Sequence, residues 1–148
     1  MSEKYSLDAG IPVQKPIENK EKLPKVLLAE DNESVRVATE MMLEMAGYET
    51  EVVENGKELL DRVLSGGKIN FIVTDNEMPE MDGLEAIKLI RNDSRFASTP
   101  IIMHSGSLTK DIIDHATSLR VVCLGKPYSF DDFEEALKRA KALVLMGE

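Results

Sequence analysis

Short apolar runs alternate with amphipathic stretches along most of the chain, and this alternation predicts strands that are each followed by a helix. The predicted strands cover residues 26–29, 49–53, 69–74, 100–104 and 120–124. The predicted helices begin near Asn32, Asn55, Asp82, Thr109 and Ser129. Strand–helix units joined by short connections place the strands parallel, with right-handed crossovers. The sequence therefore predicts an α/β fold: a doubly wound, five-stranded parallel sheet with helices on both faces.

The first and last predicted helices have the clearest apolar stripes. Spacings of 3, 4 and 3 residues predict that the first helix buries Val35, Ala38, Met42 and Met45. Gly47 is a typical residue for ending that helix. The stripe of the last helix consists of Phe130, Phe133, Leu137, Ala140 and Val144.

Residues 1–24 differ from the rest of the chain. Three of the six prolines lie here, lysine and glutamate alternate over residues 17–22, and no apolar periodicity is present. Such a composition predicts a flexible N-terminal extension. The alternative is a docking segment or an extra strand that packs on the domain, which itself covers residues 25–146.

Composition narrows the possible functions of this 148-residue chain. A net charge of −9 without a basic block disfavours direct nucleic-acid binding. The chain has no apolar run near the roughly 20 residues of a membrane span, and it shows no secretory signal. A single cysteine excludes an internal disulfide, and one cysteine with two histidines is too few for a zinc site built from these residues. A hard cation bound by carboxylates stays possible.

Chemistry is expected at the carboxyl ends of the strands, where ligands bind in doubly wound sheets. The residues at these ends are Glu30, Asp31, Asp75, Ser105 and Lys126. Individually, the acids could be helix caps or turn formers, and the lysine a solvated charge. Together they place three mutually repelling carboxylates on one rim. Mg²⁺ prefers oxygen ligands of this kind and would relieve that repulsion.

Four separated motifs resemble the receiver domain of two-component response regulators over about residues 25–146. They are Lys25–Asp31 (KVLLAED), Thr74–Gly83 (TDNEMPEMDG), Pro100–Gly106 (PIIMHSG) and Gly125–Pro127 (GKP). The resemblance implies a CheY-like, flavodoxin-like (βα)5 fold with strand order 2-1-3-4-5.

The same resemblance implies a role for each rim residue. Asp75 would accept the phosphoryl group. Mg²⁺ would be bound by Asp31, Asp75 and the backbone carbonyl of Glu77, with Glu30 acting through water or directly. Lys126 would pair with Asp75 and later with the phosphoryl group, to which Ser105 would donate a hydrogen bond.

Three positions near the rim either depart from the family pattern or are candidates for tuning the lifetime of the phosphoryl group. Cys123 stands where the family has an aromatic switch residue, and we expect it to be a small core residue rather than a redox sensor. Glu77 and Ser107 flank the path of attacking water and are candidate tuners of phosphoryl lifetime. His104 is expected to be a partly buried strand residue without a role in the site.

The function implied by the resemblance is a phosphorylation-controlled, cytoplasmic protein-binding switch rather than an enzyme with a separate substrate. Its phosphoryl donor would be a sensor histidine kinase or a histidine phosphotransfer protein. Its output surface would be the fourth and fifth predicted helices with the fifth strand. Alternatives are a receiver excised from a hybrid kinase or transcriptional regulator, a Mg²⁺-dependent phosphatase with an aspartyl-phosphate intermediate, and a pseudo-receiver, which the full set of site residues disfavours.

Overall fold

A computed structural model describes residues 23–146 of the chain, so the predicted extension lies almost wholly outside the described residues. The strands are β1 (Lys25–Ala29), β2 (Glu49–Val53), β3 (Phe71–Thr74), β4 (Ile101–Ser105) and β5 (Val122–Gly125). The helices are α1 (Glu33–Met45), α2 (Gly56–Leu64), α3 (Gly83–Arg91), α4 (Lys110–Ser118) and α5 (Phe130–Met146), with a 3-10 turn, η2 (Ser94–Phe96).

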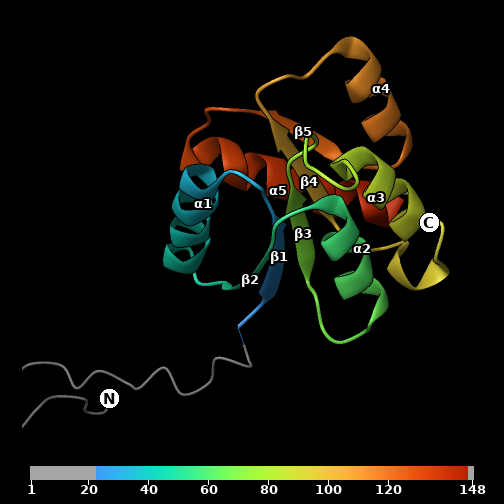
Figure 1. Cartoon of the computed structure of the whole chain (residues 1–148), viewed down its shortest axis with the longest axis horizontal. Helices are drawn as coiled ribbons and strands as arrows, with labels where there is room; N and C mark the ends of the chain where they lie inside the picture. Colours follow the sequence, from blue (N-terminus) through green and yellow to red (C-terminus); the bar gives the residue numbers. More distant parts are fainter. Residues whose placement is uncertain (1–22, 147–148) are drawn as a thin grey trace, which may run out of the picture.

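The five strands form one parallel sheet in the order β2-β1-β3-β4-β5. Helices α1 and α5 cover one face, and α2, α3 and α4 cover the other (Figure 1). The predicted doubly wound fold is confirmed, and so is the strand order implied by the resemblance. Reversal of the strand order at β1 and β3 brings the carboxyl ends of these central strands to the place where ligands bind in such sheets.

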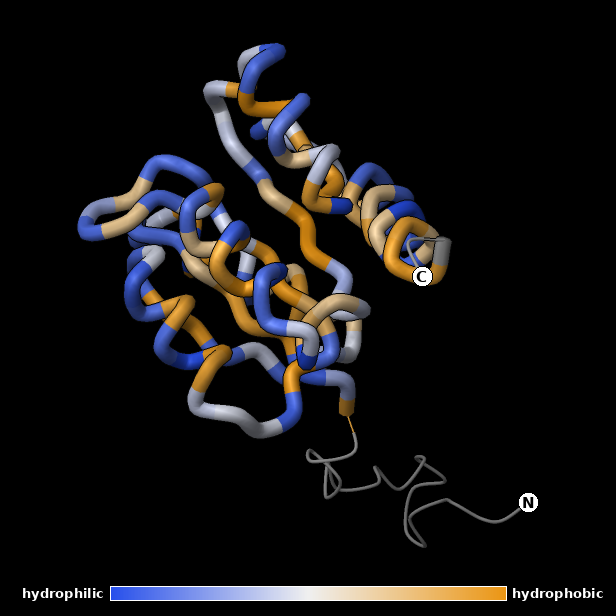
Figure 2. Tube along the Cα trace, turned by 90° about the vertical axis from the view of Figure 1, so that its right-hand side faces the viewer, coloured by the Kyte–Doolittle hydropathy of each residue, from blue (hydrophilic) through white to orange (hydrophobic). Residues whose placement is uncertain are grey.

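Two hydrophobic clusters, one on each face of the sheet, form the core. Alternate residues of a strand point to opposite faces, so Ile72 and Met103 pack against α2, α3 and α4 while Val73 and Ile102 pack against α1 and α5. The tube in Figure 2 is correspondingly apolar along the inner strands and more polar along the outer helices. Within residues 23–146, no helix is both long enough and apolar enough to cross a membrane.

The predicted helix starts are confirmed. Capping is a local interaction, so the sequence alone can indicate it. Side-chain oxygens of Asn32, Asn55, Asp82 and Thr109 each accept a hydrogen bond from a backbone N–H of the first helical turn. Ser129 caps α5 in the same way, because its hydroxyl oxygen accepts from the backbone N–H of Asp132 at 3.0 Å.

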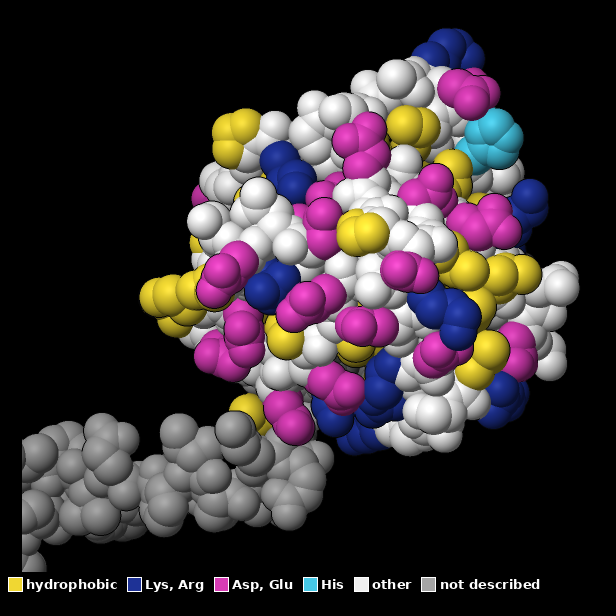
Figure 3. Space-filling view, viewed as in Figure 1, with side chains coloured by type: hydrophobic (Ala, Val, Ile, Leu, Met, Phe, Trp, Pro, Cys, Tyr) yellow, Lys and Arg dark blue, Asp and Glu magenta, His cyan; other side chains and the backbone are white. Residues whose placement is uncertain are grey.

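The predicted stripe of α1 is wrong in two of its four positions, because Val35 and Met42 are half-buried but Ala38 and Met45 are exposed. The helix buries Thr39 and Leu43, whereas Met45 is 85% exposed and Ala38 is also exposed. Four-residue spacing links Thr39 to Leu43, and Leu43 enters the core while Met42 packs against its edge. Met41 and Met45 remain outside, and Figure 3 shows hydrophobic side chains protruding over α1 at the left.

Two glycines fix the loop between β3 and α3, which begins at Asp75. The backbone N–H of Gly83 donates to the carbonyl of Asn76 at 2.7 Å, and that of Gly56 donates to the carbonyl of Met81 at 2.9 Å. A Cβ atom at Gly83 would collide with the carbonyl oxygen of Asp75, and one at Gly56 would collide with that of Met81. The absence of side chains therefore lets α2 and α3 hold the loop tightly against the sheet.

Candidate functional site

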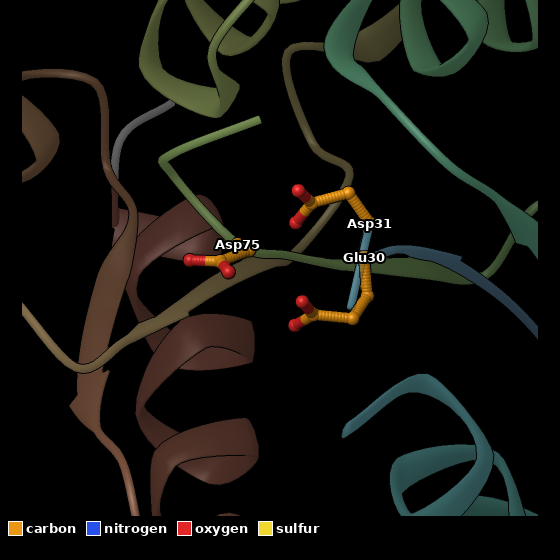
Figure 4. A group of neighbouring side chains, drawn as sticks. All are labelled: Glu30, Asp31 and Asp75. Carbon is orange, nitrogen blue, oxygen red and sulfur yellow. The ribbon is translucent and has the colours of Figure 1, made fainter. Parts of the chain in front are cut away.

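Three carboxylates gather at the carboxyl ends of β1 and β3. Glu30, Asp31 and Asp75 can each offer an oxygen, and these oxygens lie within 4.8 Å of one another. Figure 4 shows the three side chains extending toward the same side of the two strands. The parallel register places them there, because Ala29, the residue before Glu30, pairs with Thr74, the residue before Asp75.

Asp75 is buried, and protein groups bind both of its oxygens. The backbone N–H of Asn76 donates to Oδ1 at 2.6 Å, and Nζ of Lys126 donates to Oδ2 at 3.2 Å. Burial, followed by the negative charge of Glu30, raises the pKa of Asp75, and the lysine only partly offsets this. The carboxylate is therefore poorly stabilised by the protein alone, and added positive charge would favour its ionised form.

Glu30 is fully buried but is stabilised as an anion. Burial alone would raise its pKa, yet the hydrogen bond from His104, the backbone N–H of Asn32 and the charge of Lys126 together lower the pKa to about 2. His104 Nε2 lies 3.0 Å from Oε1, Lys126 Nζ lies 3.3 Å from the same oxygen, and the N–H of Asn32 lies 3.1 Å from Oε2. Glu30 and Asp75 are thus neighbouring carboxylates whose pKa values shift in opposite directions.

The donor set fits a hard divalent cation. All three side chains offer oxygen, and Asp31 is exposed to solvent while the other two are buried. Mg²⁺ keeps several of its waters and binds few carboxylates. The solvent-exposed side of the cluster, at Asp31, leaves room for those waters, and the two buried acids supply carboxylate oxygens. One ammonium, that of Lys126, compensates three carboxylates only partly.

The other predicted rim residues lie on the two neighbouring strands. Ser105 ends β4 and is buried, and its hydroxyl oxygen accepts from the backbone N–H of Ser107 at 3.0 Å. Its own carbonyl accepts from the backbone N–H of Lys126 at 2.9 Å. This bond ties the end of β4 to the segment after β5 and places Lys126 beside Asp75.

The predicted tuning residues lie at different depths. Glu77 and Ser107 are exposed on the loops after β3 and β4. Cys123 is half-buried and packs against the core on the side of α2, α3 and α4. Burial raises the pKa of its thiol, which disfavours the reactive thiolate. The tuning roles themselves remain predictions.

Sequence reasoning missed two residues that lie beside the acidic cluster. His104 is not partly buried, as expected, but wholly buried, and it bonds to Glu30 and to the hydroxyl of Tyr128 at 2.7 Å. Tyr128 was not singled out. The available signal was alternation in β4: His104 is two residues after Ile102, so it must point to the face covered by α1 and α5.

Fold and site together define a signalling receiver domain: a doubly wound sheet with an acidic cluster and a lysine at its carboxyl edge. Residues 26–138 match the family model of the response regulator receiver domain, and the chain belongs to this family. The resemblance drawn from the four motifs is confirmed.

Curated relatives include both longer sensors and regulators. The chain is 37% identical over 97 residues to the CAI-1 autoinducer sensor kinase/phosphatase CqsS of Vibrio cholerae, covering 65% of this chain and 13% of that protein. It is 34% identical to the transcriptional regulatory protein CrdR of Helicobacter pylori, covering 78% and 54%. It is 36% identical to the chemotaxis protein CheY1 of Helicobacter pylori, covering 53% and 64%. In each case the matched stretch spans less than two thirds of the relative.

Solved structures agree on the fold. The chemotaxis response regulator CheY4 of Vibrio cholerae, at 28% identity, superposes with a TM-score of 0.72 over 80% of this chain and 98% of that one. A CheY-like receiver domain protein from Methanospirillum hungatei, at 20% identity, gives 0.74 over 85% and 99%. These matches confirm the CheY-like sheet and helix arrangement.

Proposed function

We propose that this receiver domain accepts a phosphoryl group on Asp75 from a phosphohistidine of a partner protein and thereby switches a protein-binding surface. The observation that carries the proposal is the position of Asp75, whose carboxylate lies within reach of Lys126 at 3.2 Å and of two further acids within 4.8 Å. Phosphoryl transfer needs mainly positioning and neutralisation of charge, and this pocket offers both.

In the proposed transfer, a carboxylate oxygen of Asp75 forms a bond to phosphorus as the bond from phosphorus to the donor's imidazole nitrogen breaks. The electron pair of the broken bond stays on that nitrogen. Asn76 holds Oδ1 through its backbone N–H, so the carboxylate has a fixed orientation. Lys126 then shares its ammonium between the phosphoryl oxygens and Glu30. Mg²⁺ bound by Asp31, Asp75 and the backbone carbonyl of Glu77 would supply further positive charge, with Glu30 nearby.

The switch is proposed to pass through Ser105. A phosphoryl group adds strong acceptor oxygens, and the Ser105 hydroxyl can donate to one by turning toward Asp75. That movement would break the 3.0 Å bond that the hydroxyl accepts from the N–H of Ser107. The loop leading into α4 would then move, and the surface formed by α4, β5 and α5 would present a different shape to a downstream protein.

The phosphoryl donor is proposed to dock beside α1. An apolar groove there is lined by Val35, Ala38, Met42, Lys126, Pro127 and Tyr128. Because Lys126 both lines this groove and contacts Asp75, a protein seated in the groove would reach the phosphoryl acceptor. Met41 and Met45 extend the apolar surface beyond the groove. Methionine-rich surfaces adapt to helical partners, which suits a helix that carries a phosphohistidine.

Labelling with acetyl phosphate and Mg²⁺ tests the acceptor. The wild type is expected to gain one phosphoryl group by mass spectrometry, and Asp75→Asn is expected to gain none. Asp114→Asn, an exposed change on α4, is the control and should label normally. Equal labelling of Asp75→Asn and the wild type would overturn the assignment.

Two alternatives are separated by simple measurements. A Mg²⁺-dependent phosphatase would turn over an external phosphomonoester repeatedly, whereas the proposed receiver turns over only its own phosphoryl group. The similarity to CqsS and CrdR allows the receiver to be attached to a kinase or a transcriptional regulator. The gene sequence beyond the codon of Glu148 tests this alternative.

A further inference from the structure

His104 lies directly behind the acidic cluster, on the side of the sheet that α1 and α5 cover. Its side chain is wholly buried, and both ring nitrogens have partners, Nε2 with Glu30 and Nδ1 with the hydroxyl of Tyr128. A buried polar ring costs free energy unless it is hydrogen-bonded, and a leucine would fill this strand position without that requirement. Its hydrogen bonds, rather than its volume, therefore distinguish the histidine here.

The carboxylate partner of the ring fixes the direction of one of its hydrogen bonds. A carboxylate only accepts, so Nε2 of His104 carries a proton and donates it to Glu30. Nδ1 lies 2.7 Å from the hydroxyl of Tyr128, which can donate to it and which stays protonated because burial raises its pKa to about 12. Thr39 of α1 in turn hydrogen-bonds to the Tyr128 oxygen. A chain of hydrogen bonds thus runs from α1, through the segment after β5 and through β4, to the end of β1.

Glu30 is oriented by donors on both oxygens. Oε1 accepts from His104 at 3.0 Å and from Lys126 at 3.3 Å, while Oε2 accepts from the N–H of Asn32 at 3.1 Å. Of these donors, only His104 comes from the interior of the sheet. Its ring therefore contacts the carboxylate from within the sheet, whereas the lysine and the backbone N–H contact it from the segments that follow β5 and β1.

We propose that His104 is a positioning residue for the cation site, and that Tyr128 holds its ring so that Glu30 is aligned toward a divalent cation bound at Asp31 and Asp75. This inference rests on the proposed function, because it concerns the same pocket. Hydrogen-bond partners that orient metal-binding carboxylates typically change metal affinity about 10- to 100-fold when they are removed.

Direct titration of Mg²⁺ into the unphosphorylated full chain tests the proposal. His104→Leu is expected to raise the dissociation constant about tenfold or more, and His104→Gln, whose amide still donates, is expected to recover much of the affinity. Tyr128 lies outside the carboxylate cluster, and Tyr128→Phe is expected to weaken Mg²⁺ binding a few-fold. Tyr48→Phe removes the same hydroxyl from a ring that packs on Phe71 and should leave affinity unchanged.

The ring itself gives a second readout that packing alone would not move. The chain has two histidines, and the ring of His115 is exposed on α4, so the ¹⁵N signals of the two rings are distinguishable. His104 is expected to carry its proton on Nε2 in the wild type. Tyr128→Phe is expected to reduce that preference, and Mg²⁺ is expected to shift the His104 signals without shifting those of His115.

The outcomes separate the two proposals. If the wild type binds Mg²⁺ and is phosphorylated on Asp75, but His104→Leu binds Mg²⁺ equally well, the positioning role is overturned and the proposed function stands. A glutamine variant that binds no better than the leucine variant also overturns it. If the wild type itself neither binds Mg²⁺ nor accepts a phosphoryl group, both proposals fail. Should His104→Leu not fold, His104→Gln and Tyr128→Phe decide the question.

Discussion

The Nζ atom of Lys126 lies 3.2 Å from Oδ2 of Asp75, and the same ammonium lies 3.3 Å from Oε1 of Glu30. One lysine therefore bridges the carboxylate with the raised pKa and the one with the lowered pKa. Because the lysine is the cation nearest both acids among the described residues, its loss would leave two buried negative charges side by side. Removing one partner of a buried charge cluster destabilises more than the pair itself contributes.

Lys126→Met is accordingly expected to lower the free energy of unfolding by about 1–3 kcal/mol without Mg²⁺. Saturating Mg²⁺ should recover part of the loss, since a cation bound only by the native cluster stabilises the fold. Urea denaturation with and without Mg²⁺, at equal ionic strength, measures both effects. Lys110→Met removes an exposed lysine paired with Asp114 and should have little effect in either condition. A Lys126 deficit that Mg²⁺ leaves unchanged would contradict this account.

Glu77→Gln is expected to speed dephosphorylation several-fold. The exposed carboxylate stands two residues after Asp75, where it would repel a water that becomes hydroxide-like as it attacks phosphorus. The amide keeps the shape and removes the charge. Loss of the phosphoryl group is timed with Mg²⁺ present, and Glu80→Gln in the same loop is the control. A Glu77 variant that keeps its phosphoryl group as long as the wild type would show that the repulsion argument is wrong.

Arg91→Ala is expected to cost about 2–4 kcal/mol of unfolding free energy. The guanidinium donates to the carbonyls of Leu119, Phe96, Thr99 and Arg120, and so joins α3 to η2 and to the end of α4. Burial lowers the pKa of this arginine to about 10. Arg91→Lys should not restore stability, because an ammonium cannot reach four separate acceptors in this fork geometry. Thermal unfolding measures the loss, and Arg95→Ala, which removes an exposed pair with Asp93, is the control.

Glu51 gives a prediction for acid stability. The hydrogen bond from Arg62, at 2.6 Å, lowers the pKa of Glu51 despite partial burial, and Lys25 at 3.1 Å adds to the effect. A lowered pKa in the folded state stabilises the fold above the ordinary pKa of the carboxyl group, and this contribution is lost as the pH falls through the lower, folded value.

Glu51→Gln should therefore be less stable than the wild type at pH 7, by under about 1 kcal/mol because the side chain is partly exposed to solvent. The difference should shrink as the pH falls below about 4.5. Urea denaturation across this range measures it, and Glu49→Gln on the same strand controls for the loss of one negative charge. A difference that stays constant down to pH 3 would rule out this linkage.

Local signals account for what the sequence predicted well. The caps Asn32, Asn55 and Asp82 each act within three residues of their own position, so the sequence specifies them without tertiary information. The gathering of Glu30 and Asp75 was also predictable, because parallel strands end on the same edge. Apolar runs gave the strands to within about two residues, as is usual for element boundaries.

Contacts between distant elements account for what the sequence did not predict. His104 and Tyr128 are 24 residues apart, and only the packing of β4 against the segment after β5 brings them together. In α1, the single predicted stripe included Ala38 and Met45, whereas the burial of Thr39 and Leu43 depends on which side chains the sheet and α5 accept. The buried Thr39 lies on the stripe that the hydrophobic pattern did not favour, and its hydroxyl joins the polar chain behind the site.

Neighbouring side chains of β4 point to opposite faces of the sheet. Met103 packs toward α2, α3 and α4, His104 toward α1, and Ser105 accepts from the loop that leads to α4. In the proposed scheme, cation binding therefore affects the structure through His104 on the side of α1. Phosphorylation affects it through Ser105 on the side of α4. A dye attached near α1 and another attached near α4 would report two separate events, and a single dye would mistake one for the other.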